Sequence, residues 1–117
     1  MIKSFRDKKT ERIFTRRFTR RFPQNLHRVA WRKLMILDAA EQLSDLRVPP
    51  GNRLEKLSRD RAGEFSIRIN DQWRVCFRWK DGNAYDVEIT DYHKIPEIIN
   101  NYAETIEEIG PNPFKDM

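Results

Sequence analysis

The sequence predicts an α+β domain in which an antiparallel sheet packs against helices near the N-terminus. Between residues 24 and about 44, apolar side chains recur at the spacing of an amphipathic helix. Between residues 65 and 90, three short runs alternate apolar and polar residues and are separated by turn residues, as in an antiparallel meander. Because the helix and the sheet each have an apolar face to cover, we expect them to pack together as two layers.

Caps and spacing predict the elements before the meander. Residues 2–5 alternate and predict a short first strand, and Asp7 is the expected N-cap of a short helix over residues 7–14. Asn25 is the expected N-cap of the long helix. The apolar stripe of the long helix comprises Val29, Ala30, Leu34, Leu37, Ala40 and Leu43.

Residues 16–22 interleave two arginine pairs with phenylalanines and end at Pro23. One interpretation is RNA contact, because Arg pairs with phosphate and Phe stacks on bases. The other is a linker whose Phe side chains dock on the core while the Arg side chains stay solvated. Aromatic residues are more often packed, which favours the linker.

The meander is expected over residues 65–69, 73–79 and 84–90, with turns near 70–72 and 80–83 and loops at 48–52 and 59–63. Alternation divides its residues between two faces. The core face is expected to hold Phe65, Ile67, Ile69, Val75, Phe77, Trp79, Tyr85, Val87 and Ile89. The opposite face is expected to present Arg68, Arg74, Arg78 and Glu88.

Charge and composition limit the classes of function. The net charge is +5, and residues 1–61 hold 17 Lys and Arg against 7 Asp and Glu. This part is as basic as many nucleic-acid-binding domains, although charge alone does not separate RNA, DNA and an acidic protein as the partner. The single cysteine forms no intramolecular disulfide, and no apolar run reaches membrane-spanning length. With no signal-peptide pattern either, a soluble cytoplasmic protein with no membrane partner is expected.

Metal-free RNA cleavage needs a base, an acid and a cation that holds the phosphate. His93 follows Asp91 and Tyr92 at the end of the last strand, so three proton-handling groups cluster there. Arg74 can hold a phosphate, or it can be a surface residue paired with Glu88 across the strands. A histidine at a strand end is more often an ordinary surface residue, and His27 is expected to be structural or exposed. No metal-binding or cofactor motif is present, so neither is expected.

Three segments together with residues 1–5 resemble one known family. They are residues 49–55, residues 61–77 (RAGEFSIRINDQWRVCF) and residues 87–93 (VEITDYH). This combination is similar to HigB-type toxins, the plasmid-maintenance killer branch of the RelE-like superfamily, over residues 1–93. The resemblance implies a compact RelE-like fold and metal-independent cleavage of messenger RNA in the ribosomal A site. It also implies a HigA-type helix-turn-helix antitoxin, through which alone the toxin would reach operator DNA.

The same resemblance implies roles for residues of the site. Arg74 would stabilise the phosphate, and His93 would act as acid or base, with Asp91 and Tyr92 orienting or assisting it. Arg61 would be a second phosphate contact. Further RNA contacts are expected from Lys56, Arg59, Arg68 and Arg78.

The chain departs from the family pattern at two positions. Ser58 and Asn70 stand where some members carry a basic residue. The charge around the phosphate is then thinner, or is rebuilt from Arg61, Arg68 and Arg78, and a slow nuclease is expected. The alternative is an RNA- or DNA-binding module, or an operon co-repressor, with weak or no nuclease activity.

Residues 94–117 extend beyond the family pattern and carry a net charge of −3. Their isoleucine spacing predicts an amphipathic helix that starts near Pro96 and ends at Gly110 and Pro111. We therefore expect a toxin domain over residues 1–93 and an acidic, helical extension over 94–117. The extension can cover the basic face, dock the antitoxin or a second copy, or simply pack on the body.

Overall fold

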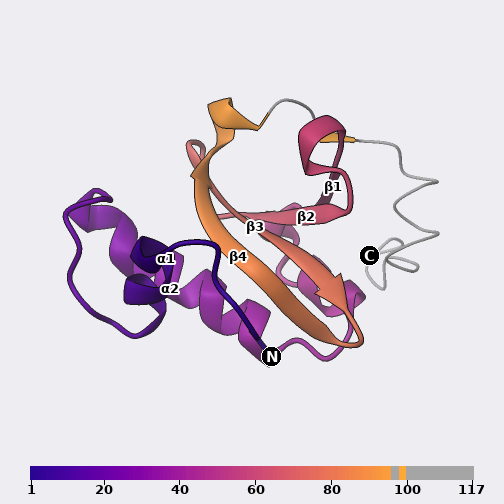
Figure 1. Cartoon of the computed structure of the whole chain (residues 1–117), viewed down its shortest axis with the longest axis horizontal. Coiled ribbons are helices and arrows are strands. Elements are labelled where there is room, and N and C mark those ends of the chain that lie inside the picture. The colour runs from indigo at the N-terminus through magenta and orange to yellow at the C-terminus, as the bar shows by residue number, and fades with distance from the viewer. Residues whose placement is uncertain (96–97, 100–117) are drawn as a thin grey trace.

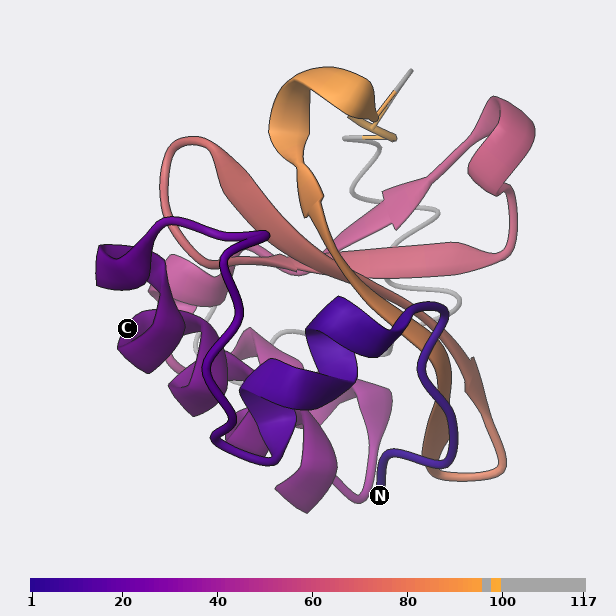
Figure 2. The same cartoon turned by 60° about the vertical axis from the view of Figure 1, so that its left-hand side comes forward.

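The computed structural model describes residues 1–95 and the backbone of residues 98–99. Helices α1 and α2 lie on one face of a twisted antiparallel sheet, which forms the second layer (Figures 1 and 2). The strand order is β4-β3-β2-β1-β5. The predicted α+β class is confirmed. The helices are α1 (Lys8–Phe14) and α2 (Gln24–Ala39), the short turns are η1 (Leu43–Arg47), η2 (Pro50–Asn52), η3 (Arg59–Arg61) and η4 (Tyr92–Lys94), and the strands are β1 (Glu55–Leu57), β2 (Glu64–Arg68), β3 (Trp73–Lys80), β4 (Asn83–Asp91) and β5 (Ile98–Ile99).

The two helices differ in how they begin. Asp7 caps α1 as predicted, since its carboxylate accepts a hydrogen bond from the backbone N–H of Thr10 at 2.8 Å. The Asn25 cap is wrong, because α2 begins after Pro23 and has no side-chain cap. The buried stripe of α2 also starts at Leu26, whereas Val29 is exposed. The helix ends at residue 39, earlier than predicted, and η1 follows over residues 43–47.

The N-terminal segment lies along β4 without forming a continuous strand. Ile2 and Phe5 make isolated parallel bridges with Ala84 and Val87, respectively. The predicted first strand is therefore reduced to two bridges. Its backbone still extends the sheet beyond β4.

A β-bulge in β4 changes which residues face the core. Cys76 pairs with Glu88, but Arg78 pairs with Tyr85, so β4 holds one extra residue between the two pairs. Asp86 occupies this bulge with φ of 52°. Alternation therefore breaks at Asp86, and Ala84 rather than Tyr85 joins the buried core. The other predicted core-face residues of the meander pack in or against this core.

The second face of the sheet is covered, which the sequence did not predict. Leu57 of β1, Cys76 of β3 and Ile95 form a small buried cluster on that side. Arg74 is consequently only 3% exposed, so its predicted surface position is wrong. Arg78 and Arg68 remain more accessible, with side chains 46% and 34% exposed.

The predicted helix from Pro96 conflicts with the backbone of β5. Ile98 and Ile99 pair in antiparallel register with Leu57 and Lys56, so residues 98–99 are strand. The rest of that prediction lies outside the described residues. None of the described helices is both long and apolar enough to cross a membrane.

The buried thiol of Cys76 allows a direct check of this packing. Burial raises the pKa of Cys76 to about 12, so the thiol stays protonated at pH 8. We expect no reaction of the native protein with a disulfide reagent at pH 8 on the time scale of minutes, and one thiol titrated per chain in guanidinium chloride. Fast reaction of the native protein would contradict the covered second face.

Candidate active site

Arg74 is the buried centre of the site. Its Nε donates to Ser66 Oγ at 2.7 Å, and its Nη2 donates to the carbonyl of Arg53 at 2.5 Å. Nη1 makes no hydrogen bond with the described residues. The guanidinium is thus fixed along its Nε and Nη2 edge, and its Nη1 donors are not used by the described residues.

Strand register places the partners of Arg74. Ser66 lies on β2 diagonally across from Arg74, because Ser66 pairs with Cys76. Arg53 has a left-handed conformation, with φ of 44°, where η2 ends, and the chain turns there into β1. Neither Ser66 nor Arg53 was predicted from the sequence as a site residue. For Ser66, the strand alternation was a usable signal, since it placed Ser66 on the same face as Arg74.

Glu55 is a further member of the site that was not predicted from the sequence. Its carboxylate lies 3.8 Å from Arg74 Nη2, and its buried Oε2 has no hydrogen-bond partner among the described residues. Burial raises the pKa of Glu55, and the charges of Arg74 and Arg53 oppose that rise. Burial likewise lowers the pKa of Arg74, while Glu55, Cys76 and Tyr92 oppose that change. Glu55 and Arg74 therefore each offset part of the cost of burying the charge of the other.

Asp91 and His93 form a hydrogen-bonded pair where β4 ends. Asp91 Oδ1 lies 2.9 Å from the backbone nitrogen of His93 and 3.1 Å from its Nδ1. Gln72 donates to the other oxygen at 3.2 Å. The hydrogen bond from the His93 backbone N–H, and then those from the side chains of Gln72 and His93, lower the pKa of Asp91. An ionised Asp91 thus holds the imidazole through Nδ1 and leaves Nε2 to the solvent.

The turn η4 brings Asp91, Tyr92 and His93 together where β4 ends. The chain leaves the extended conformation after Asp91, so Tyr92 and His93 need not alternate across a strand. Their rings lie 6.0 Å apart and nearly perpendicular. The His93 side chain is 79% exposed.

Arg68 and Arg74 lie at the same end of the sheet as this pair. Arg68 is opposite Arg74 in the β2–β3 register, and Arg74 is opposite Thr90. Arg68 also forms an ion pair with Asp71 in the adjoining turn. Arg68, Arg74 and the Asp91–His93 pair thus lie at one end of the sheet.

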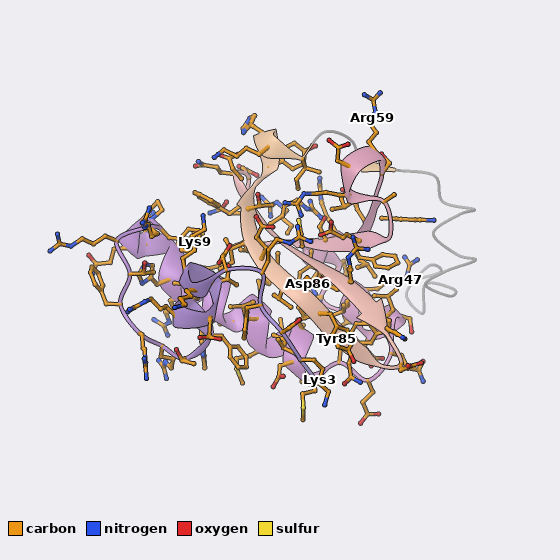
Figure 3. All side chains as sticks on the ribbon, viewed as in Figure 1. Lys3, Lys9, Arg47, Arg59, Tyr85 and Asp86 are labelled. Atoms are coloured by element: carbon orange, nitrogen blue, oxygen red, sulfur yellow. The ribbon has the colours of Figure 1, made fainter. Side chains whose placement is uncertain are left out.

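The remaining predicted phosphate contacts interact with other groups of the protein. Arg78 is four residues along β3 from Arg74, about 13 Å at the usual rise. It lies 3.7 Å from Asp86, and Arg61 pairs at 3.0 Å with both Glu64 and Glu88. Lys56 and Arg59 also interact with neighbouring groups, and Figure 3 shows Arg59 extending away from η3. Arg61 and Arg78 are therefore engaged by carboxylates in this structure.

Asn70, one of the two departures from the family pattern, has a structural role. Its Oδ1 accepts hydrogen bonds from the backbone N–H groups of Gln72 and Trp73, both at 2.8 Å. It thereby shapes the turn that leads into Arg74. Nowhere in the described part of the chain do three potential metal ligands come together.

Comparison with known proteins identifies the class and then the family. A family described as the RelE-like toxin of type II toxin-antitoxin system HigB matches residues 3–93, which places the chain among the RelE-like toxins. It is 43% identical over 95 residues to Toxin HigB-1 of Vibrio cholerae, covering 80% of this chain and 99% of the relative. It is 35% identical over 98 residues to Endoribonuclease HigB of Proteus vulgaris, covering 80% of this chain and all of that relative. The chain belongs to the HigB-like toxin family, as its sequence motifs predicted.

Proposed function

We propose that this HigB-family toxin is a metal-independent endoribonuclease that cleaves messenger RNA in the ribosomal A site. The observation that supports it most is the fixed Arg74 guanidinium at the same end of the sheet as the Asp91–His93 pair. Membership of a type II system implies a cognate antitoxin. We further propose that this antitoxin is a HigA-type helix-turn-helix protein that brings the toxin to operator DNA, and that the toxin acts in the cytoplasm.

The geometry supports a two-proton mechanism. The ribose 2′-oxygen attacks the adjacent phosphorus, the bond from phosphorus to the 5′-oxygen breaks, and a cyclic phosphate and a 5′-hydroxyl result. Arg74 Nη1 donates to the phosphate as negative charge builds there. His93 Nε2 either takes the 2′-hydroxyl proton or gives a proton to the 5′-oxygen, and water or Tyr92 exchanges the other proton. Tyr92 is exposed beside His93 and is available to assist.

The charges around the site support a slow enzyme. Arg61 and Arg78 face carboxylates, so each must give up an ion pair before it contacts RNA. The ribosome would then supply part of the alignment between the 2′-hydroxyl and the phosphate.

His93→Ala tests this function. His93 is exposed, and Asp91 keeps its hydrogen bond from Gln72 in the variant, so we expect the variant to fold. Because it lacks the proposed acid or base, we expect it to cleave about a hundredfold more slowly. The measurement is growth arrest on induced expression with mapped messenger cuts, and the exposed-residue variant Lys80→Ala is the control. If His93→Ala cuts at the wild-type rate, His93 is neither acid nor base. If the folded wild type makes no cuts, the binding-module alternative replaces the nuclease.

A further inference from the structure

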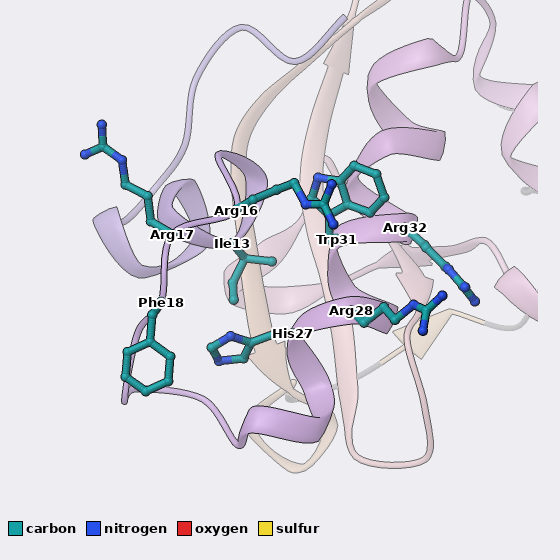
Figure 4. A pocket seen from close by; sticks show the side chains of 8 residues that line it. All are labelled: Ile13, Arg16, Arg17, Phe18, His27, Arg28, Trp31 and Arg32. Atoms are coloured by element: carbon teal, nitrogen blue, oxygen red, sulfur yellow. The ribbon is translucent and has the colours of Figure 1, made fainter.

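A second candidate site lies in the helical layer. A pocket of about 460 Å³ opens between the end of α1, the linker that follows it and the outer face of α2 (Figure 4). None of its lining residues belongs to the sheet. They are Ile13, Arg16, Arg17, Phe18, His27, Arg28, Trp31 and Arg32.

The charge in this pocket is not neutralised. Residues 12–37 contain eight Lys and Arg and no Asp or Glu. None of the four pocket arginines forms an ion pair with a carboxylate of the described residues. On the sheet side, ion pairs engage Arg6, Arg61, Arg68, Arg74 and Arg78. The positive charge of the four pocket arginines therefore remains available to an anion.

The pocket also presents flat aromatic and guanidinium surfaces. Phe18 is 63% exposed, and its ring lies 5.8 Å from that of His27. Arg16 stacks over Trp31, 4.4 Å from the ring centre. Figure 4 shows the rings of Phe18 and His27 at one end and the guanidinium groups of Arg16, Arg28 and Arg32 toward the other. The docking interpretation of the linker thus holds for Phe22, which is buried, but not for Phe18.

We propose that this pocket is a second RNA-binding site, separate from the Arg74–His93 site. A single-stranded segment places one base on Phe18 and His27 and its phosphates on Arg28 and Arg32. The exposed ring favours RNA over an acidic peptide, because a base offers a flat face to stack on, whereas a carboxylate side chain does not. The choice of RNA as the ligand rests on the proposed function.

The test measures binding and not cleavage. Fluorescence anisotropy of a labelled ten-residue oligoadenylate is recorded for the full chain, for Arg28→Glu with Arg32→Glu, and for Phe18→Ala. The control is Lys3→Glu with Lys80→Glu, which changes the net charge equally at exposed residues outside the pocket. We expect the double arginine variant to weaken binding at least about tenfold and to reduce the salt slope by about 1.4, the loss of two phosphate contacts. We expect Phe18→Ala to weaken binding about fivefold or more, as for one lost stacking partner.

Several outcomes would overturn the proposal. The proposal fails if the wild type does not bind the oligonucleotide, or if the control variant weakens RNA binding as much as the pocket variant does. It also fails if the pocket variant keeps RNA binding and loses only antitoxin binding, which would indicate an acidic peptide as the ligand. The bound RNA can be ribosomal RNA or the messenger, and co-sedimentation with ribosomal subunits that lack messenger separates the two. Loss of co-sedimentation in the pocket variant indicates ribosomal RNA, and unchanged co-sedimentation indicates the messenger. Failure of the proposed nuclease function appears separately, as a wild-type protein that binds the oligonucleotide but makes no messenger cuts.

Discussion

Replacement of Arg74 by alanine is expected to slow RNA cleavage by about a thousandfold and to destabilise the fold. One preorganised donor aimed at developing charge is worth about a hundredfold to a thousandfold. Arg74 fits this role because Ser66 and the Arg53 carbonyl fix its orientation before any RNA binds. Arg74→Lys keeps the charge but cannot hold both partners and a phosphate in one plane, so we expect it to restore little activity.

The loss of stability must be separated from the loss of catalysis. Arg74→Ala leaves the Glu55 carboxylate half-buried without its counter-charge, and removal of one member of a buried pair costs about 3–5 kcal/mol. The double variant Arg74→Met with Glu55→Gln removes both charges and keeps much of the volume. We expect it to recover most of the free energy of unfolding in urea titrations and to remain inactive.

Two results would count against this account of Arg74. If the double variant cleaves at the wild-type rate, Arg74 does not contact the phosphate. If Arg74→Ala is as stable as the wild type, the contacts of the guanidinium with Ser66, Arg53 and Glu55 do not stabilise the fold. Single-turnover cleavage on programmed ribosomes and urea unfolding of the same preparations measure both effects.

The elements that could be predicted from the sequence are those with local signals. The Asp7 cap, the long helix and the three-stranded meander each follow from caps, turns or periodicity within a few residues. The clustering of Asp91, Tyr92 and His93 follows from their adjacency and required only a turn after the strand.

Non-local structure limited what could be predicted of the site. β1 is three residues long and has no periodic pattern, so neither its pairing with β2 nor the burial of Arg74 beside it could be inferred. The bulge at Asp86 interrupts the alternation that placed Tyr85 in the core. Arg61 and Glu88 are 27 residues apart, and only the folded sheet brings them together.

Replacement of Glu64 by alanine is expected to cost more stability than any other removal of a single carboxylate near the sheet. The Glu64 carboxylate is 2% exposed and lies 3.2 Å from Arg6 and 3.0 Å from Arg61. It therefore joins the N-terminal segment and the η3 turn to the start of β2. Its loss leaves two guanidinium groups facing a partly desolvated cavity, and we expect a decrease of about 3–5 kcal/mol in the free energy of unfolding.

Glu88→Ala is the matched control, because Glu88 contacts the same two arginines at 3.0 Å but is 17% exposed. Water can solvate the two arginines more easily where the lost carboxylate was more accessible than that of Glu64. We therefore expect Glu88→Ala to lower the free energy of unfolding by only about 1 kcal/mol. Urea unfolding of both variants and of Arg61→Ala measures the difference, and equal losses for Glu64→Ala and Glu88→Ala would contradict it. A large stability loss in Arg61→Ala, with cleavage per folded molecule unchanged, would assign Arg61 to this buried network. A small stability loss with slow cleavage would instead support the phosphate contact that the family resemblance implies.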